Sequence, residues 1–191
     1  MAQALKPEPR VGIAQFDAFV AGLADAPDYE LVDGEIVLMS NPTETHEQLA
    51  ANIGAPLKLA MNKRGCRTYQ GGIRVQADGN VHGINKFRPD VVVRCGPRGT
   101  GTCITDPVVV VEVLSPSTME KDRGHKLRFY KSLPTMQHIL LVYGEEMRVE
   151  HWSRADEGWN MAFHTRSDEV VALGAVEFEI GLREIYFDLP F

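Results

Sequence analysis

Cysteine, positive charge and long apolar runs are all scarce in this chain of 191 residues. Its three cysteines, Cys66, Cys95 and Cys103, are an odd number without C-x-x-C spacing. The sequence therefore predicts free, partly buried thiols rather than a disulfide framework or a zinc site. Acidic residues outnumber basic ones by 26 to 20, for a formal net charge of −6. This balance excludes a protein that coats nucleic acid through its overall charge.

Membrane and secretion signals are also missing. No run approaches the roughly 20 apolar residues of a membrane span, and residues 1–10 hold no signal-peptide core. We therefore expect a cytoplasmic protein that does not enter a membrane. The remainder, 44% hydrophobic and 24% charged, is ordinary for a folded globular chain. Its length suits one compact domain, which we place at residues 29–191 after an N-terminal helix and lead-in at residues 1–28.

The hydrophobic periodicity predicts an α/β protein. Helical spacing marks residues 12–24, 44–63 and 118–132, with a final helical turn at 182–186. Asp33-Gly34 between two apolar runs predicts a tight hairpin over residues 29–39, and Pro56 predicts a kink or a later start in the second helix. Strands are expected at 67–76 (broken by glycines at 71 and 72), 88–94, 106–114, 139–143, 148–153, 159–164 and 175–180. This order is typical of a mixed sheet covered by helices.

Two acidic residues stand where valine-rich strands should exclude charge. Asp90 opens one such strand, and Glu112 lies inside the other among valines. An ionised carboxylate buried without a partner costs several kcal/mol, so each needs a cation, hydrogen bonds or a raised pKa. Oxygen donors on neighbouring strands suit Mg²⁺ or Mn²⁺ and indicate metal-assisted hydrolysis. Structural ion pairs with an arginine or lysine are the alternative.

The helix expected at 118–132, with a capping box at Ser117 and Glu120, offers a cation for this site. Its Lys126 shares one face with Asp122 and Tyr130 at i±4. There it can orient or help deprotonate an attacking water and offset charge developing on phosphorus. An ordinary surface pair between Lys126 and Asp122 is the alternative.

His46 lies on the inward stripe of the helix expected at 44–63, four residues before Ala50. A histidine on such a face is either a site residue or a hydrogen-bonded core residue, and the spacing leaves both readings open.

Five motifs follow one another between about residues 29 and 152. They are Tyr29–Glu35 (YELVDGE), Met39–His46, Pro89–Val93 (PDVVV), Glu112–Thr118 (EVLSPST) and Asp122-x3-Lys126-x3-Tyr130. Together they resemble the Uma2 family of endonucleases, within the PD-(D/E)XK nuclease superfamily. The resemblance implies a restriction-endonuclease-like fold, with a mixed central β-sheet flanked by α-helices.

The resemblance also implies an activity, the hydrolysis of DNA phosphodiester bonds by a metal-dependent endonuclease. Its metal would be Mg²⁺, with Mn²⁺ as a substitute. Asp90 and Glu112 would bind the metal together with the carbonyl oxygen of Val113. Lys126 would assist the attacking water, and His46 would be a further active-site residue.

Two positions depart from the pattern that the resemblance sets. The superfamily lysine two residues after the glutamate is replaced by Leu114, so Lys126 inherits its role. Gln70 stands where the family commonly has an acidic or polar residue, which implies at most a supporting role near the metal. Two alternatives stay open: a non-catalytic nuclease-fold module that binds nucleic acid or protein, and a hydrolase of a smaller phosphoester.

Local features bear on partners. Residues 119–131 carry five basic and two acidic residues, a balance of 5 − 2 = +3 that gives DNA affinity of low specificity. The loop Gly96–Gly101 (GPRGTG) lacks the lysine of a phosphate loop and predicts a flexible turn. The aromatic stretch Tyr186–Phe191 and the edges of a small sheet favour a homodimer.

Overall fold

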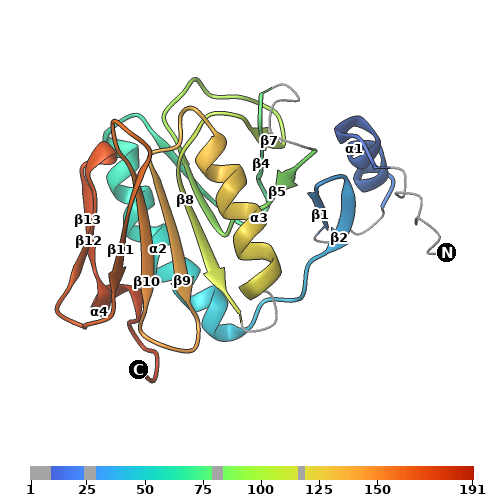
Figure 1. Ribbon diagram of the computed structural model, residues 1–191. Helices are drawn as coiled ribbons and strands as arrows, with labels where there is room; N and C mark the ends of the chain where they lie inside the picture. The colour runs from blue at the N-terminus through green and yellow to red at the C-terminus, as the bar shows by residue number, and fades with distance from the viewer. Residues whose placement is uncertain (1–9, 24–28, 79–83, 116–118) are drawn as a thin grey trace.

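The computed structural model describes residues 10–23, 29–78, 84–115 and 119–191 (Figure 1). Within these ranges lie four α-helices, whose bounds are α1 Ile13–Ala21, α2 Glu44–Lys63, α3 Met119–Ser132 and α4 Leu182–Ile185. The strands form three sheets around them. No helix in these ranges is long and apolar enough to cross a membrane. The predicted capping box at Ser117 and Glu120 lies outside the described residues.

The largest sheet has six strands and contains both valine-rich segments. Its spatial order is β11 (Trp159–His164), β10 (Val149–Arg154), β9 (His138–Tyr143), β8 (Pro107–Leu114), β6 (Val91–Arg94) and β3 (Arg67–Gln70). β8 and β9 are parallel, and the other neighbours are antiparallel. β8 and β9 are buried almost throughout, as expected for strands covered on both faces.

Alternate residues of these strands supply two separate cores, because successive side chains point to opposite faces of a sheet. Val91 and Val111 pack with α2, α4 and the hairpin of β12 (Val170–Leu173) and β13 (Phe178–Gly181). Val92 and Val110 pack with Phe129 and its neighbours on α3. The six-stranded sheet thus lies between α2 on one face and α3 on the other (Figure 1).

A smaller five-stranded sheet packs beside α3. Its order is β2 (Glu35–Leu38), β1 (Tyr29–Val32), β5 (Lys86–Phe87), β4 (Arg74–Gln76) and β7 (Cys103–Ile104). The predicted hairpin is confirmed as β1–β2, with φ of 47° at Asp33 and 84° at Gly34.

The break expected at residues 71 and 72 is confirmed, and it separates β3 from β4, which belong to different sheets. Gly71 and Gly72, with φ of 51° and 78°, turn the chain between them. The strand expected at 175–180 is also displaced: a 3₁₀ turn at Gly174–Val176 precedes β13, and β12 was not predicted.

Helix α2 begins where the sequence predicted and continues through Pro56. Its N-cap is Thr43, whose side chain accepts a hydrogen bond from the His46 backbone N–H at 3.2 Å. Pro56 removes only one donor, while buried Ile53, Leu57 and Met61 hold the helix against the sheet, so tertiary packing outweighs the local cost.

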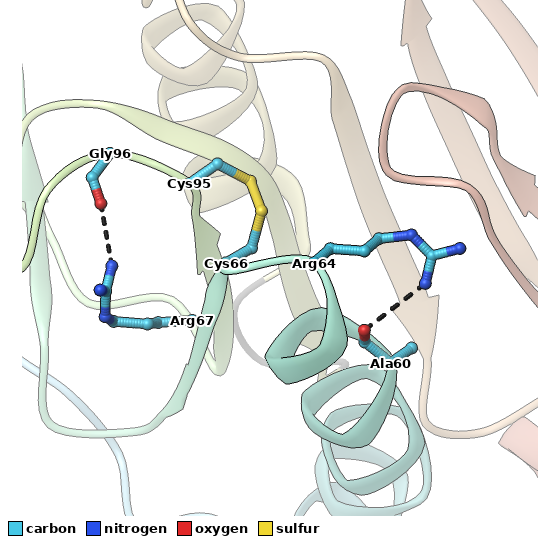
Figure 2. The surroundings of a disulfide bond; sticks show 6 residues. All are labelled: Ala60, Arg64, Cys66, Arg67, Cys95 and Gly96. Carbon is cyan, nitrogen blue, oxygen red and sulfur yellow. Dashed lines mark hydrogen bonds between the residues drawn. A yellow bond between two sulfur atoms is a disulfide. The ribbon is translucent and has the colours of Figure 1, made fainter.

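The expectation of three free thiols is wrong. Cys66 and Cys95 form a disulfide, with their Cα atoms 4.1 Å apart, and only Cys103 is free among the cysteines (Figure 2). The two residues are 29 apart in sequence, but Arg67 pairs with Arg94 in the β3–β6 ladder, so the cysteines one step beyond come opposite each other. Burial raises the pKa of the Cys103 thiol to about 11. Spacing in the sequence gives no sign of such a cross-strand pair.

The C-terminal aromatic stretch is partly buried and partly exposed. Tyr186 is buried on the chain's own core, and its hydroxyl lies 2.6 Å from the Arg148 carbonyl. Phe187 and Phe191 stay exposed. The loop at 96–101 has no regular structure and joins β6 to β7, as predicted.

Candidate active site

Asp90 and Glu112 come opposite each other at one end of the β6–β8 pair. The last ladder pair is Val91 with Val111, so the next positions in this antiparallel register are Asp90 and Glu112. The Val113 backbone N–H donates to Asp90 Oδ2 at 2.6 Å, which ties the strands together at this point. Like charges that face each other across strands are destabilising, so this pair needs compensation from neighbouring elements.

Helix α3 supplies the compensation for Glu112. Tyr130 Oη donates to Glu112 Oε1 at 2.6 Å, and Lys126 Nζ donates to Glu112 Oε2 at 3.1 Å. These two side chains are one helical turn apart, so both reach the same carboxylate. Burial raises the pKa of Glu112 despite the attraction of Lys126, and the charges of Asp90 and Glu30 raise it further. Burial and then Glu112 also raise the pKa of Tyr130.

Lys126 is shared between two carboxylates. Its Nζ lies 3.0 Å from Glu30 Oε1, and that oxygen also accepts the Arg88 backbone N–H at 2.8 Å. Burial alone would lower the pKa of Lys126, but Glu112, Glu30 and Asp90 raise it above its usual range. Lys126 is therefore a buried cation held in place from two sides.

The sequence interpretation gave no role to Glu30 or to the Tyr130 hydroxyl. Glu30 carries the same signal as Glu112, since it is an acid placed between apolar residues of a strand and is buried there. Tyr130 was on the predicted face with Lys126, but spacing alone did not show that its hydroxyl would meet Glu112.

His46 reaches the site from the first turn of α2. Its Nε2 lies 3.2 Å from Asp90 Oδ1. Its Nδ1 is buried, has no hydrogen-bond partner among the described residues and lies 3.7 Å from Glu47 Oε1. Burial lowers the pKa of this imidazole, but the hydrogen bond and charge of Asp90 raise it more, so the net pKa lies above the usual value. Of the two predicted possibilities for His46, the structure places it against the acidic pair.

A cavity of about 500 Å³ opens over these groups. Its lining includes every residue that the sequence singled out for the site: His46, Asp90, Glu112, Val113 and Lys126. Glu30, Arg88 and the segment from Val37 to Thr43 complete much of the wall.

Two other expectations fare differently. The Gln70 side-chain amide donates to the Ala50 carbonyl at 3.0 Å, and Gln70 is not among the residues that line the cavity. It supports α2 rather than the acidic pair. The side chain of Asp122, whose surface pair with Lys126 was the alternative interpretation, lies outside the described residues.

The basic segment 119–131 is less exposed than the sequence suggested. Lys126 is buried in the site, and Lys131 Nζ stands 3.0 Å from the centre of the Trp152 ring. Arg128 donates to the Gly124 carbonyl within its own helix. The side chains of Lys121 and Arg123 lie outside the described residues. Of the five expected cations, Lys126 is thus engaged inside the protein and Lys131 is half-buried against an aromatic ring.

The donor atoms suit a hard cation. Across the described ranges, no three His, Cys, Asp or Glu side chains are arranged to hold a metal ion. Mg²⁺, however, is commonly bound through one or two carboxylates while it keeps several waters. Asp90 and Glu112 present two carboxylates at one cavity, so their chemistry fits that ion. Lys126 lies beside them and balances part of their negative charge.

Comparison with known proteins gives consistent matches. The family described as "Uma2: Putative restriction endonuclease" matches residues 13–183. Two uncharacterized proteins of Synechocystis sp. are similar: slr1290 is 28% identical over 165 residues, covering 85% of each chain. The other, sll1609, is 29% identical over 135 residues, covering 68% of this chain and 75% of its own.

A solved structure shares the fold. It is a chain from Anabaena variabilis described as "a putative nuclease belonging to DUF820", with a TM-score of 0.72 at 16% identity, covering 88% of this chain and 95% of that one. The fold is therefore the mixed α/β, restriction-endonuclease-like fold of nucleases. The chain belongs to the Uma2 family.

Proposed function

We propose that this protein is a Mg²⁺-dependent endonuclease, with Mn²⁺ as a substitute, that hydrolyses DNA phosphodiester bonds in the cavity above Asp90 and Glu112. The observation that carries this proposal is the cross-strand acidic pair with a buried lysine beside it. Lys126 Nζ stands 3.1 Å from Glu112 Oε2, at a cavity of about 500 Å³. Membership of the Uma2 family supports the nuclease class.

Asp90, Glu112 and the carbonyl oxygen of Val113 would hold the metal ion. When bound, Mg²⁺ polarises a phosphoryl oxygen and makes water a better nucleophile. Lys126, fixed by Glu30, orients the attacking water and stabilises negative charge on the phosphoryl group.

His46 holds the other side of Asp90. Because a carboxylate only accepts hydrogen bonds, Nε2 of His46 carries the proton that Asp90 Oδ1 receives at 3.2 Å. This contact orients Asp90, and it leaves Nδ1 as the ring atom at which a proton is taken up or released.

The lysine of the site comes from a helix and not from position 114. Leu114 lies on the same face of β8 as Glu112, in the core on the α3 side, and also lines the cavity. Lys126, one turn before Tyr130 on α3, delivers the ammonium group to the carboxylate instead.

The test is nicking of supercoiled plasmid in Mg²⁺ and in Mn²⁺. Asp90→Asn, Glu112→Gln and Lys126→Met are compared with the wild type and with Glu179→Gln, an exposed acid on β13. We expect the wild type and the control to cut, and each site variant to lose about 100-fold or more in rate. Calorimetry with Mg²⁺ should show binding that Asp90→Asn removes.

One observation favours the non-catalytic binding module as a second candidate. Both oxygens of Glu112 already have partners within the protein, Tyr130 and Lys126. If the wild type cuts nothing in either metal and binds no Mg²⁺, the catalytic proposal fails and this candidate replaces it. A wild type that cleaves small phosphodiesters but no DNA would instead indicate the smaller-phosphoester hydrolase.

We also propose that the protein forms a homodimer, supported by exposed Phe187 and Phe191 near its C-terminus. A mass of 21.2 kDa, one chain, in light scattering at micromolar protein would refute this.

A further inference from the structure

The cavity above Asp90 and Glu112 has one apolar wall that the proposed chemistry does not use. It consists of Val37 and Leu38 at the end of β2, followed by Met39. Val37 is 38% exposed and Leu38 62% exposed, although both are aliphatic. β2 is the outermost strand of its sheet, so no further strand among those described covers it.

The strand register places Val37, one residue of this wall, directly beside the charged groups. Val37 pairs with Glu30 across the β1–β2 ladder, and cross-strand partners point to the same face. Glu30 in turn contacts Lys126 at 3.0 Å. The apolar side chain of Val37 therefore lies next to the carboxylate of Glu30, which contacts the ammonium group of Lys126.

The charges around the cavity do not suit a double helix. Its lining holds four acidic side chains, Glu30, Glu47, Asp90 and Glu112, against the permanent cations Arg88 and Lys126. Lys126 already contacts two carboxylates. Binding along a nucleic-acid backbone, in a duplex or in a single strand, depends on several lysines and arginines, and the chain as a whole carries −6. The cavity therefore suits one phosphate at the ion site rather than a run of phosphates.

An unpaired nucleotide fits the same surroundings better. Its phosphate would lie toward the ion site, while the face of its base, which is available only outside the stack, would lie against Val37 and Leu38. A cavity of about 500 Å³ is of the size that holds one small ligand. We infer that the site binds a nucleotide of single-stranded or locally unpaired DNA, with Val37 and Leu38 as the base-contacting wall. This inference deepens the proposed function and rests on it for the position of the phosphate.

The experiment measures binding and cutting separately. Fluorescence anisotropy follows a labelled 20-nucleotide single strand and the same sequence as a blunt duplex, both with a cleavage-resistant phosphorothioate backbone, bound to the wild-type protein in Mg²⁺. We expect the single strand to bind at least tenfold more tightly. Val37→Ser and Leu38→Ser together should weaken single-strand binding about tenfold, about 1.4 kcal/mol, because the base loses an apolar surface to cover.

The matched control is Leu59→Ser. Leu59 is 69% exposed on α2 and is not part of the cavity lining, so its replacement should leave binding unchanged. Equal or tighter binding of the duplex, no binding of the single strand, or an unchanged affinity in the Val37→Ser/Leu38→Ser protein would overturn the inference. If the wild type binds the single strand as expected but cuts neither DNA in Mg²⁺ or Mn²⁺, the nuclease proposal fails while the binding inference stands.

Discussion

Replacing Lys126 with methionine should destabilise the protein more than any surface substitution. Lys126 Nζ lies 3.1 Å from Glu112 Oε2 and 3.0 Å from Glu30 Oε1, and each side chain is at most 10% exposed. At an effective dielectric constant of about 20, each contact corresponds to about 5 kcal/mol of attraction, offset by the cost of burying the charges. Removing one partner of such a buried cluster costs about 3–5 kcal/mol.

Burial raises the pKa of Glu112 to about 8, so urea denaturation at pH 9 in EDTA, where this carboxylate is ionised, measures the loss as a change in the free energy of unfolding. Lys58→Met, on the exposed face of α2, is the matched control and should change it by less than about 0.5 kcal/mol. A double-mutant cycle with Glu112→Gln tests the pairing itself. The double variant should lose at least about 1 kcal/mol less than the sum of the two single variants.

The reasoning is refuted if Lys126→Met loses no more than the Lys58→Met control, or if the two single losses simply add. Either result would mean that Lys126 does not balance the buried carboxylates. Addition of Mg²⁺ gives an independent check. A divalent ion bound by Asp90 and Glu112 should restore part of the stability that Lys126→Met loses, by about 2.7 kcal/mol at 100 times its dissociation constant.

Three further outcomes are expected. Burial lowers the pKa of His138 and of His151 to about 4. The free energy of unfolding should therefore be highest above pH 6.5, the usual pKa of histidine, and fall on the order of 2–4 kcal/mol as the pH drops to 4. Urea titrations should show a smaller fall for His138→Gln/His151→Gln. The double variant Cys66→Ser/Cys95→Ser removes a disulfide between residues 29 apart in sequence and should lower the free energy of unfolding by about 3–4 kcal/mol. The reduced wild type should lose the same amount. Tyr130→Phe removes a 2.6 Å hydrogen bond to a buried carboxylate and should cost about 1.5–3 kcal/mol in thermal unfolding, whereas no change would show that the hydroxyl is dispensable.

The sequence by itself determined the second valine strand, the hairpin at Asp33-Gly34 and the helices at 44–63 and 118–132 to within a residue or so, whereas the first valine strand, expected from residue 88, begins at Val91. These follow from short-range rules, because periodicity and turn chemistry are visible in neighbouring positions. It also singled out Asp90 and Glu112, since a charge inside an apolar run is conspicuous without any knowledge of the fold.

Only the tertiary structure decided how these pieces meet. The β6–β8 register places Asp90 opposite Glu112, and the β3–β6 register places Cys66 opposite Cys95, although the sequence had indicated free thiols. It also brings Glu30 from another sheet to Lys126. Such contacts join residues that are far apart in the chain. They are fixed by the free energy of burying both faces of the sheet, and a local sequence pattern does not show this free energy.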